Sequence, residues 1–256
     1  ERALTQNGYN IWPSEFSLDA YKLVFVSGDI PQAYLITVGT TIVGTFFSMV
    51  FTCGAAYAMS VKNFKSRGVL ALFIYFTMLF NGGLVANYLL TTKFLHLQNN
   101  ILVLLLPSFC NAWNILLMRN FFSGIPASLA ESAKIDGAND ITILIKIIIP
   151  ISLPGIATIG LFYALTYWNE WYKCLLYIDS SHSQYYTLQY LIQQILRQVN
   201  YAANQPAEAV GLNSLTLPTY AYRMATIIVA IGPIILLYPF LQKYFVQGLT
   251  VGSVKG

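Results

Sequence analysis

The chain has 256 residues, of which 56% are hydrophobic and only 9% are charged, and its formal net charge is +4. Soluble domains carry about 25% charged residues, so this composition excludes an ordinary water-soluble globule and a disordered chain. The small and dispersed net charge also excludes a nucleic-acid-binding protein.

Cysteine and histidine are too scarce to indicate a disulfide framework or a metal centre. The cysteines Cys53, Cys110 and Cys174 form no Cys-x-x-Cys pair, and His96 and His182 are far apart in the sequence. Neither pattern has the spacing that zinc sites or disulfide scaffolds require. We therefore expect no metal site and no catalytic residue in this chain.

Five long uncharged stretches dominate the sequence. They cover 30–61, 68–92, 94–118, 147–169 and 224–242, and all are rich in Leu, Ile, Val and Phe. A helix needs roughly 20 apolar residues to cross the hydrocarbon core of a bilayer. Five buried helices of a soluble core are the alternative, which the low charge does not favour. We predict five membrane spans in a single all-α, polytopic integral-membrane domain over 1–256.

The basic residues predict the orientation of these spans. The turn at 62–67 holds three basic residues and no acid, and positive loops remain in the cytoplasm. With that turn inside, 119–146 and the C-terminus are also inside, whereas 93–100 and 171–222 are outside. The inner side then carries eight basic and three acidic residues, and the outer side six and seven.

This topology places residue 1 outside the cytoplasm. We expect 1–29 to form an extracytoplasmic segment that leads into the first visible span. A protein made in the cytoplasm most simply has one more span before Glu1. We therefore expect a missing N-terminal span, which gives six in all.

The inner segment 119–146 is unusually polar for this chain. Pro126 suits an early helical position, and Ser128-x-x-Glu131 is typical of a capping box. Gly137 can adopt the left-handed conformation that ends a helix, and Asn139 or Asp140 can cap the next one. The pattern predicts a helix, a glycine corner and a second helix. A structured loop of this kind protrudes from the spans, which indicates that a partner holds it.

Two further features follow in chain order. Pro150 and Pro154 are expected to bend the fourth visible span. Within the outer segment 179–222, an apolar helical face is predicted opposite a glutamine-rich one. Packing on the membrane or on neighbouring spans is one interpretation of this face, and docking of an external partner is the other. The apolar positions are Leu188, Leu191, Ile192, Ile195, Leu196 and Val199.

The inner segment also contains a spaced motif. Glu131-Ser132-Ala133 is followed by three residues, Gly137, nine residues, and Ile147-x-Ile149-Pro150. This resembles the signature of the membrane subunits of binding-protein-dependent ABC importers, with serine and isoleucine in place of an alanine and a leucine. The stretch 168–171 and the tail 242–256 are similar to the carbohydrate branch, which includes the maltose-type second permease and the LplC/YtcP-like subfamily.

The resemblance implies a type I ABC importer transmembrane domain, multi-pass in the bacterial cytoplasmic (inner) membrane. It implies four partners: a second permease subunit forming a heterodimer, a cytoplasmic ATPase dimer, an extracytoplasmic solute-binding protein and a carbohydrate substrate. The chain has no Gly-x-x-x-x-Gly-Lys-[Ser/Thr] phosphate loop. We therefore expect no cofactor and no enzymatic activity in this chain, with ATP and Mg bound by the partner ATPase.

The family implies that the inner loop couples the spans to the ATPase. Glu131 is the natural contact for a basic residue, Ala133 permits close approach, and Gly137 sets the corner. Asp136 either belongs to this contact or caps its helix locally. The expected coupling residues are Glu131, Ser132, Ala133, Asp136 and Gly137.

Polar and aromatic residues within or at the ends of the spans are the candidates for a substrate pathway. Intramembrane polar groups usually face a bundle interior or a wet cavity. Hydrogen bonding between helices is one interpretation, and a sugar pathway with amides on hydroxyls and tryptophans stacking on rings is the other. The candidates are Asn81, Asn111, Asn114, Trp113, Trp168, Asn169 and Glu170.

Other functions fit the sequence less well. A secondary carrier would fit the hydropathy but not the inner-loop motif, and the two halves of the chain show no repeat. A membrane-embedded enzyme would need a His, Asp or Cys constellation at one depth. We predict the permease subunit of an ATP-driven importer, forming half of the pathway for an oligosaccharide or other carbohydrate, with a non-sugar solute as the alternative.

Overall fold

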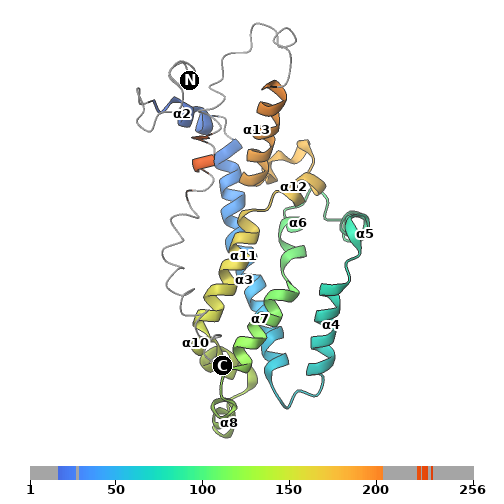
Figure 1. Ribbon diagram of the computed structural model, residues 1–256, viewed down its shortest axis with the longest axis vertical. Coiled ribbons are helices and arrows are strands. Elements are labelled where there is room, and N and C mark those ends of the chain that lie inside the picture. The colour runs from blue at the N-terminus through green and yellow to red at the C-terminus, as the bar shows by residue number, and fades with distance from the viewer. Residues whose placement is uncertain (1–16, 27–28, 204–223, 226, 230–231, 233–256) are drawn as a thin grey trace. The chain divides into compact units, whose positions relative to one another are not determined.

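The computed structural model describes residues 17–26, 29–203, 224, 225, 227–229 and 232, and every regular element in these ranges is a helix (Figure 1). This confirms the predicted all-α class for the described part of the chain. The described residues form two compact units. One holds those up to Val38 together with those from Glu170 onward, and the other holds 39–169.

The helices follow one another closely along the chain. In order they are α2 (Asp19–Val26), α3 (Asp29–Ser60), α4 (Arg67–Leu79), α5 (Gly83–Leu89), the π-helix η1 (Leu90–Phe94), α6 (Leu102–Leu105), the 3₁₀-helix η2 (Leu106–Ser108), α7 (Ala112–Ser123), α8 (Ala127–Ile135), α9 (Asp140–Ile143), the π-helix η3 (Leu144–Ile148), α10 (Ile149–Ile151), α11 (Leu153–Trp168), α12 (Tyr172–Tyr177), the 3₁₀-helix η4 (Ser180–Tyr185) and α13 (Leu188–Ala203).

Helix α3 is the one described helix that is long and apolar enough to cross a membrane unbroken. Its 32 residues extend over about 48 Å at the usual helical rise, which exceeds the roughly 30 Å of a hydrocarbon core. It coincides with the predicted span 30–61. Outward-facing apolar side chains such as Ile42 and Phe46, both more than 60% exposed, suit a lipid environment.

Three more predicted spans coincide with pairs of helices that bend at a short break. The bends are 112° between 67–79 and 83–94, 49° between 102–108 and 112–123, and 89° between 140–151 and 153–168. Counting each pair as one span gives up to four spans in the described part of the chain. The fifth predicted span, 224–242, lies mostly outside the described residues.

Local side-chain chemistry accounts for the first two breaks. Between α4 and α5, Asn81 Oδ1 accepts a hydrogen bond from the backbone N–H of Gly83 at 2.8 Å. Gly83 has a φ of +80°, which glycine adopts without steric cost. Before α7, Pro107 lies in η2, and Asn111 caps the new helix by accepting from the N–H of Asn114 at 3.1 Å.

The third break confirms the bend predicted from two prolines. It lies at Ser152, which separates α10 from α11 and is flanked by Pro150 and Pro154. Each proline lacks the N–H that would continue the helical hydrogen bonds. The arm 140–151 and the helix α11 therefore run in different directions.

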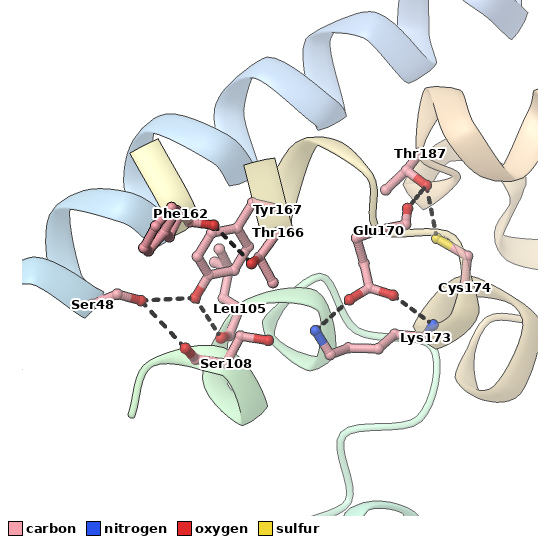
Figure 2. Close-up of polar contacts among 10 residues, drawn as sticks. All are labelled: Ser48, Leu105, Ser108, Phe162, Thr166, Tyr167, Glu170, Lys173, Cys174 and Thr187. Atoms are coloured by element: carbon pink, nitrogen blue, oxygen red, sulfur yellow. Dashed lines mark hydrogen bonds and ion pairs between the residues drawn. The ribbon is translucent and has the colours of Figure 1, made fainter. Parts of the chain in front are cut away.

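Two tyrosines of α11 organise the core of the unit that holds 39–169. The Tyr167 hydroxyl lies 3.0 Å from Ser48 Oγ on α3 and donates to the Leu105 carbonyl at 3.1 Å (Figure 2). One turn earlier, the Tyr163 hydroxyl lies 2.7 Å from Thr52 Oγ1. Both tyrosines are 1% exposed. Their hydroxyl groups cannot reach water, so these bonds replace the hydrogen bonds to water that burial removes.

Gly44 gives the Tyr167 ring room against α3. A Cβ at this position would lie 2.5 Å from a ring carbon of Tyr167, whereas a Cβ at Gly54 of the same helix would meet nothing within 4 Å. The absence of a side chain at Gly44 is therefore a packing requirement.

The unit that holds Glu170 contains the amphipathic helix predicted in the outer segment. Leu188 and Leu191 of α13 are buried. The N–H of Leu188 donates to Thr37 Oγ1 at 2.9 Å, which attaches the start of α13 to the first part of α3. The apolar face is thus used for packing within this unit, as the simpler interpretation of the sequence predicted.

We expect Gly44→Ala to destabilise the protein, because the added methyl group must displace the Tyr167 ring. Overpacking of this kind costs about 1–3 kcal/mol. Gly54→Ala is the matched control, and its midpoint of thermal unfolding should be unchanged or higher because alanine favours a helix. The measurement is thermal unfolding of the purified protein in detergent. Equal midpoints for the two variants would contradict the packing role.

Candidate functional site

The inner loop folds as the sequence predicted, into a helix, a glycine corner and a second helix. Gly137 follows α8 with a φ of +83°. Its N–H donates to the Lys134 carbonyl at 3.0 Å, and the N–H of Ala138 donates to the Ala133 carbonyl at 2.9 Å. These two bonds form a Schellman motif, which ends a helix and fixes the direction of the following chain.

The two helix starts in this loop differ from each other. Asn139 caps α9 by accepting a hydrogen bond from the N–H of Thr142 at 2.8 Å, as predicted. The predicted capping box is wrong, because Pro126 occupies the N-cap of α8 without a side-chain cap bond and Ser128 is already the second helical residue. The fixed φ of proline suits a helix start, so α8 begins two residues earlier than the box requires.

Helix α8 has an inner and an outer face. Ala130 and Ala133 pack against the buried core of the same unit. Glu131 and Ser132 are exposed, as are Asp136 and Gly137. The small side chain of Ala133 therefore permits close approach to the chain's own core, and the predicted polar residues face outward.

Two large apolar residues of α8, Leu129 and Ile135, are also exposed. The side chain of Ile135 is 86% exposed, next to the exposed Ser132 and Asp136.

An ion pair closes the corner between α8 and α9. Lys134 Nζ lies 2.9 Å from Asp140 Oδ1, with both side chains well exposed. The hydrogen bond that Lys134 donates to the Asp140 carboxylate raises the pKa of the Lys134 ammonium group. Asp136 has no ion pair within the described residues, and its backbone N–H donates to the Ser132 carbonyl at 3.1 Å as the C-cap of α8.

The predicted pathway residues of this unit lie at three helix ends. Asn81 is at the break after α4, Asn111 and Asn114 are together at the start of α7, and Asn169 follows α11, where its Nδ2 donates to the Leu165 carbonyl at 2.9 Å. Asn81, Asn111 and Asn169 thus bond to the nearby backbone. These side-chain hydrogen bonds are local, whereas one interpretation expected bonds between helices.

The two predicted tryptophans have opposite environments. Trp113 of α7 is 58% exposed, whereas Trp168 at the end of α11 is 6% exposed. Asn114, next to Trp113, is buried. Of the two indoles, Trp113 is the one whose ring is accessible in this chain.

Glu170 belongs to the other unit and has partners of its own. Its carboxylate accepts a hydrogen bond from the N–H of Lys173 at 2.9 Å and pairs with Lys173 Nζ at 2.5 Å (Figure 2). The two side chains are 12% and 15% exposed. The Glu170 carbonyl accepts the hydroxyl of Thr187, whose oxygen also lies 3.5 Å from Cys174 Sγ. Burial raises the pKa of the Cys174 thiol, which keeps it neutral.

Sequence reasoning missed the hydroxyl contacts between α3 and α11. Ser48 and Thr52 are four residues apart on α3, as are Tyr163 and Tyr167 on α11. Residues at this spacing share one face of a helix. The sequence did contain a signal for these contacts, because each of the two apolar spans has a pair of hydroxyl residues four positions apart.

We expect Glu170→Gln to destabilise the unit that contains it, because the change leaves the Lys173 ammonium group buried without its counter-charge. Breaking a buried pair costs about 3–5 kcal/mol. Asp19→Asn removes the exposed pair with Lys22, whose side chains are 75% and 74% exposed, and should cause no measurable change. Thermal unfolding of the two variants makes the comparison, and equal stability would contradict a structural role for the Glu170 pair.

Comparison with known proteins places this arrangement in a family. The family described as "Binding-protein-dependent transport system inner membrane component" matches residues 48–251. A permease protein of Bacillus subtilis, named for polygalacturonan/rhamnogalacturonan transport (YtcP), is 42% identical over 95% of this chain and 84% of its own length. The LplC protein of the same organism is 37% identical over 100% of this chain and 85% of its own.

A solved structure is also similar. It is a chain of a bacterial ABC transporter involved in the import of the acidic polysaccharide alginate, with a TM-score of 0.83 and 33% identity over 95% of this chain and 85% of that one. The signature predicted from 131–150 lies within the family match, on the glycine corner described above. The chain belongs to the family of binding-protein-dependent transport system inner membrane components.

Proposed function

We propose that this chain is the permease subunit of an ATP-driven carbohydrate importer and forms half of its translocation pathway. The family membership and the transport functions for which the relatives are named support the proposal. The observation that carries it is the glycine corner, which anchors one face of α8 to the core and leaves Glu131, Ser132 and Ile135 exposed.

The corner is suited to transmit movement. A force on the outer face of α8 passes to the core through Ala130 and Ala133. It also passes through the corner and the arm 140–151 to α11, which begins at the bend beside Ser152. In this proposal a partner ATPase, which holds ATP and Mg, seats α8 in a cleft and converts its own closure into movement of the spans.

The remaining partners follow from the family. We propose a second permease subunit in a heterodimer, an ATPase dimer on the cytoplasmic side and an extracytoplasmic solute-binding protein. The chain is then multi-pass in the bacterial inner membrane with its C-terminus in the cytoplasm. A single transmembrane domain over 1–256, with 1–29 and 179–222 outside and a span at 224–242, belongs to the same proposal.

A carbohydrate pathway is proposed along the polar helix ends of the unit that holds 39–169. The exposed Trp113 ring and the neighbouring Asn111 provide an aromatic face and an amide at the break before α7. Sugars are bound by such combinations of stacking and hydrogen bonding. Glu170 is less suited to direct contact with a solute, because its carboxylate is already occupied by Lys173.

Orientation can be tested with single cysteines on a cysteine-free background. Ser66→Cys, in the basic turn before α4, should be labelled by a membrane-impermeant maleimide only from the cytoplasmic side. Ser181→Cys, in the segment after α12, should be labelled only from outside. The reason is the excess of Lys and Arg at the inner ends of the spans. Labelling of both positions from one face would overturn the proposed topology.

Coupling can be tested at the corner. Gly137→Val places a β-branched residue at a φ of +83°, which costs about 1–2 kcal/mol, and should change the direction of α8. The assembled transporter should then hydrolyse ATP without responding to substrate and binding protein. Gly137→Asn is the matched control, since asparagine tolerates this conformation, and it should retain most of the response.

Charge reversal gives an independent test of the same surface. Glu131→Lys should weaken copurification of the ATPase while leaving the amount of permease in the membrane unchanged, because Glu131 is exposed. Normal sugar uptake by both Glu131→Lys and Gly137→Val would contradict the coupling role. Uptake that persists without any ATPase would instead support a secondary carrier.

A further inference from the structure

A hollow of about 350 Å³ lies behind the coupling helix α8. Its walls come from the inner end of α3, the turn 61–66, the end of α7 and α8 itself, all within the unit that holds 39–169. In Figure 1 the turn after α3 and helix α8 lie at the same end of this unit. The lining combines apolar groups such as Phe122 and Ile148 with a set of charged side chains.

The charges that line the hollow are mostly positive. Lys62, Arg67, Arg119 and Lys134 contribute four cations, and Glu131 is the one carboxylate among these described lining residues. Lys134 is already paired with Asp140. The remaining three cations form no ion pair within the described part of the chain.

Arg119 is the least exposed of these three cations. Its side chain is half-buried, whereas Lys62 and Arg67 are exposed, and it has no ion-pair partner among the described residues. Such a group is stabilised when an anion enters its site. Two arginines on one hollow favour phosphate in particular, because a guanidinium group binds its oxygens with two parallel hydrogen bonds.

The surroundings of the hollow indicate where the phosphate comes from. Arg67 is the first residue of α4, and the next turns of that helix expose Val69, Leu72 and Phe73 by 65–72%. A ligand in the hollow thus meets cations together with apolar groups such as Phe122 and Ile148, and α4, which starts at Arg67, carries an exposed apolar surface. A phospholipid of the cytoplasmic leaflet has this amphiphilic form, and basic pockets on the cytoplasmic side bind anionic head groups.

We propose that the hollow binds a phosphate group carried by an anionic phospholipid, held by Lys62, Arg67 and Arg119. This rests on the proposed membrane topology, which places the hollow on the cytoplasmic side. The phosphate would lie beside Glu131, which lines the same hollow. Occupation of the hollow would therefore affect the charge environment of α8, and anionic lipid would influence how the ATPase responds to substrate.

The test uses the complete transporter purified with its partner subunits. The complex is exchanged into vesicles of phosphatidylcholine with a small fraction of phosphatidylglycerol, re-extracted, and analysed by native mass spectrometry for retained phosphatidylglycerol. The variants Arg67→Gln and Arg119→Gln should each lower retention roughly fivefold, because each removes one of the cations that hold the head group in the hollow. Lys65→Gln is the matched control, since Lys65 lies in the same basic turn but does not line the hollow, and its retention should equal that of the unaltered protein.

Three outcomes would overturn the proposal. Equal losses in Lys65→Gln and Arg119→Gln would indicate general surface attraction without a site. Displacement of the lipid signal by excess inorganic phosphate would identify a free phosphate ligand. Loss of ATPase copurification in Arg119→Gln, with lipid retention unchanged, would assign the cations to the ATPase interface. Lipid retention is measured without transport, so its failure leaves the permease function intact, and failed uptake leaves the lipid site intact.

Discussion

The packing of α11 against α3 depends on hydroxyl groups that have no water to bond with. Tyr163 and Tyr167 are almost fully buried, and each hydroxyl meets a Ser or Thr of α3. Within lipid, an unpaired polar group costs several kcal/mol, so these contacts fix the register of the two helices. Gly44 permits the approach by leaving space for the Tyr167 ring.

The same register positions the coupling helix. The core that surrounds Tyr163 and Tyr167 also contacts Ala130 and Ala133 of α8, so the inner loop rests on the spans that it is proposed to move. The Schellman bonds at Gly137 and the ion pair between Lys134 and Asp140 hold the corner from both sides. A loop fixed in this way can transmit a displacement, whereas a flexible one would absorb it.

The proposed lipid site and the proposed ATPase contact both involve this short helix. Its outer face presents Glu131, Ser132 and Ile135, and behind it the cationic hollow is lined by Arg119 and Lys62. Because Glu131 contributes to both, the proposed lipid site and the proposed ATPase contact share one carboxylate. The basic residues from which the topology is proposed would then also influence how the ATPase responds to substrate.

The sequence alone determined the all-α membrane class, the glycine corner, the Asn139 cap and the bend between Pro150 and Pro154. Each depends on a local rule: uncharged length, a left-handed glycine, a side-chain cap or a missing N–H. The tertiary structure alone decided that Ser128 is not an N-cap and that Ala133 faces its own core. It also decided which hydroxyls meet and where Lys62, Arg67 and Arg119 converge. These depend on contacts between segments distant in the chain, or on where a helix actually starts, which local spacing does not encode.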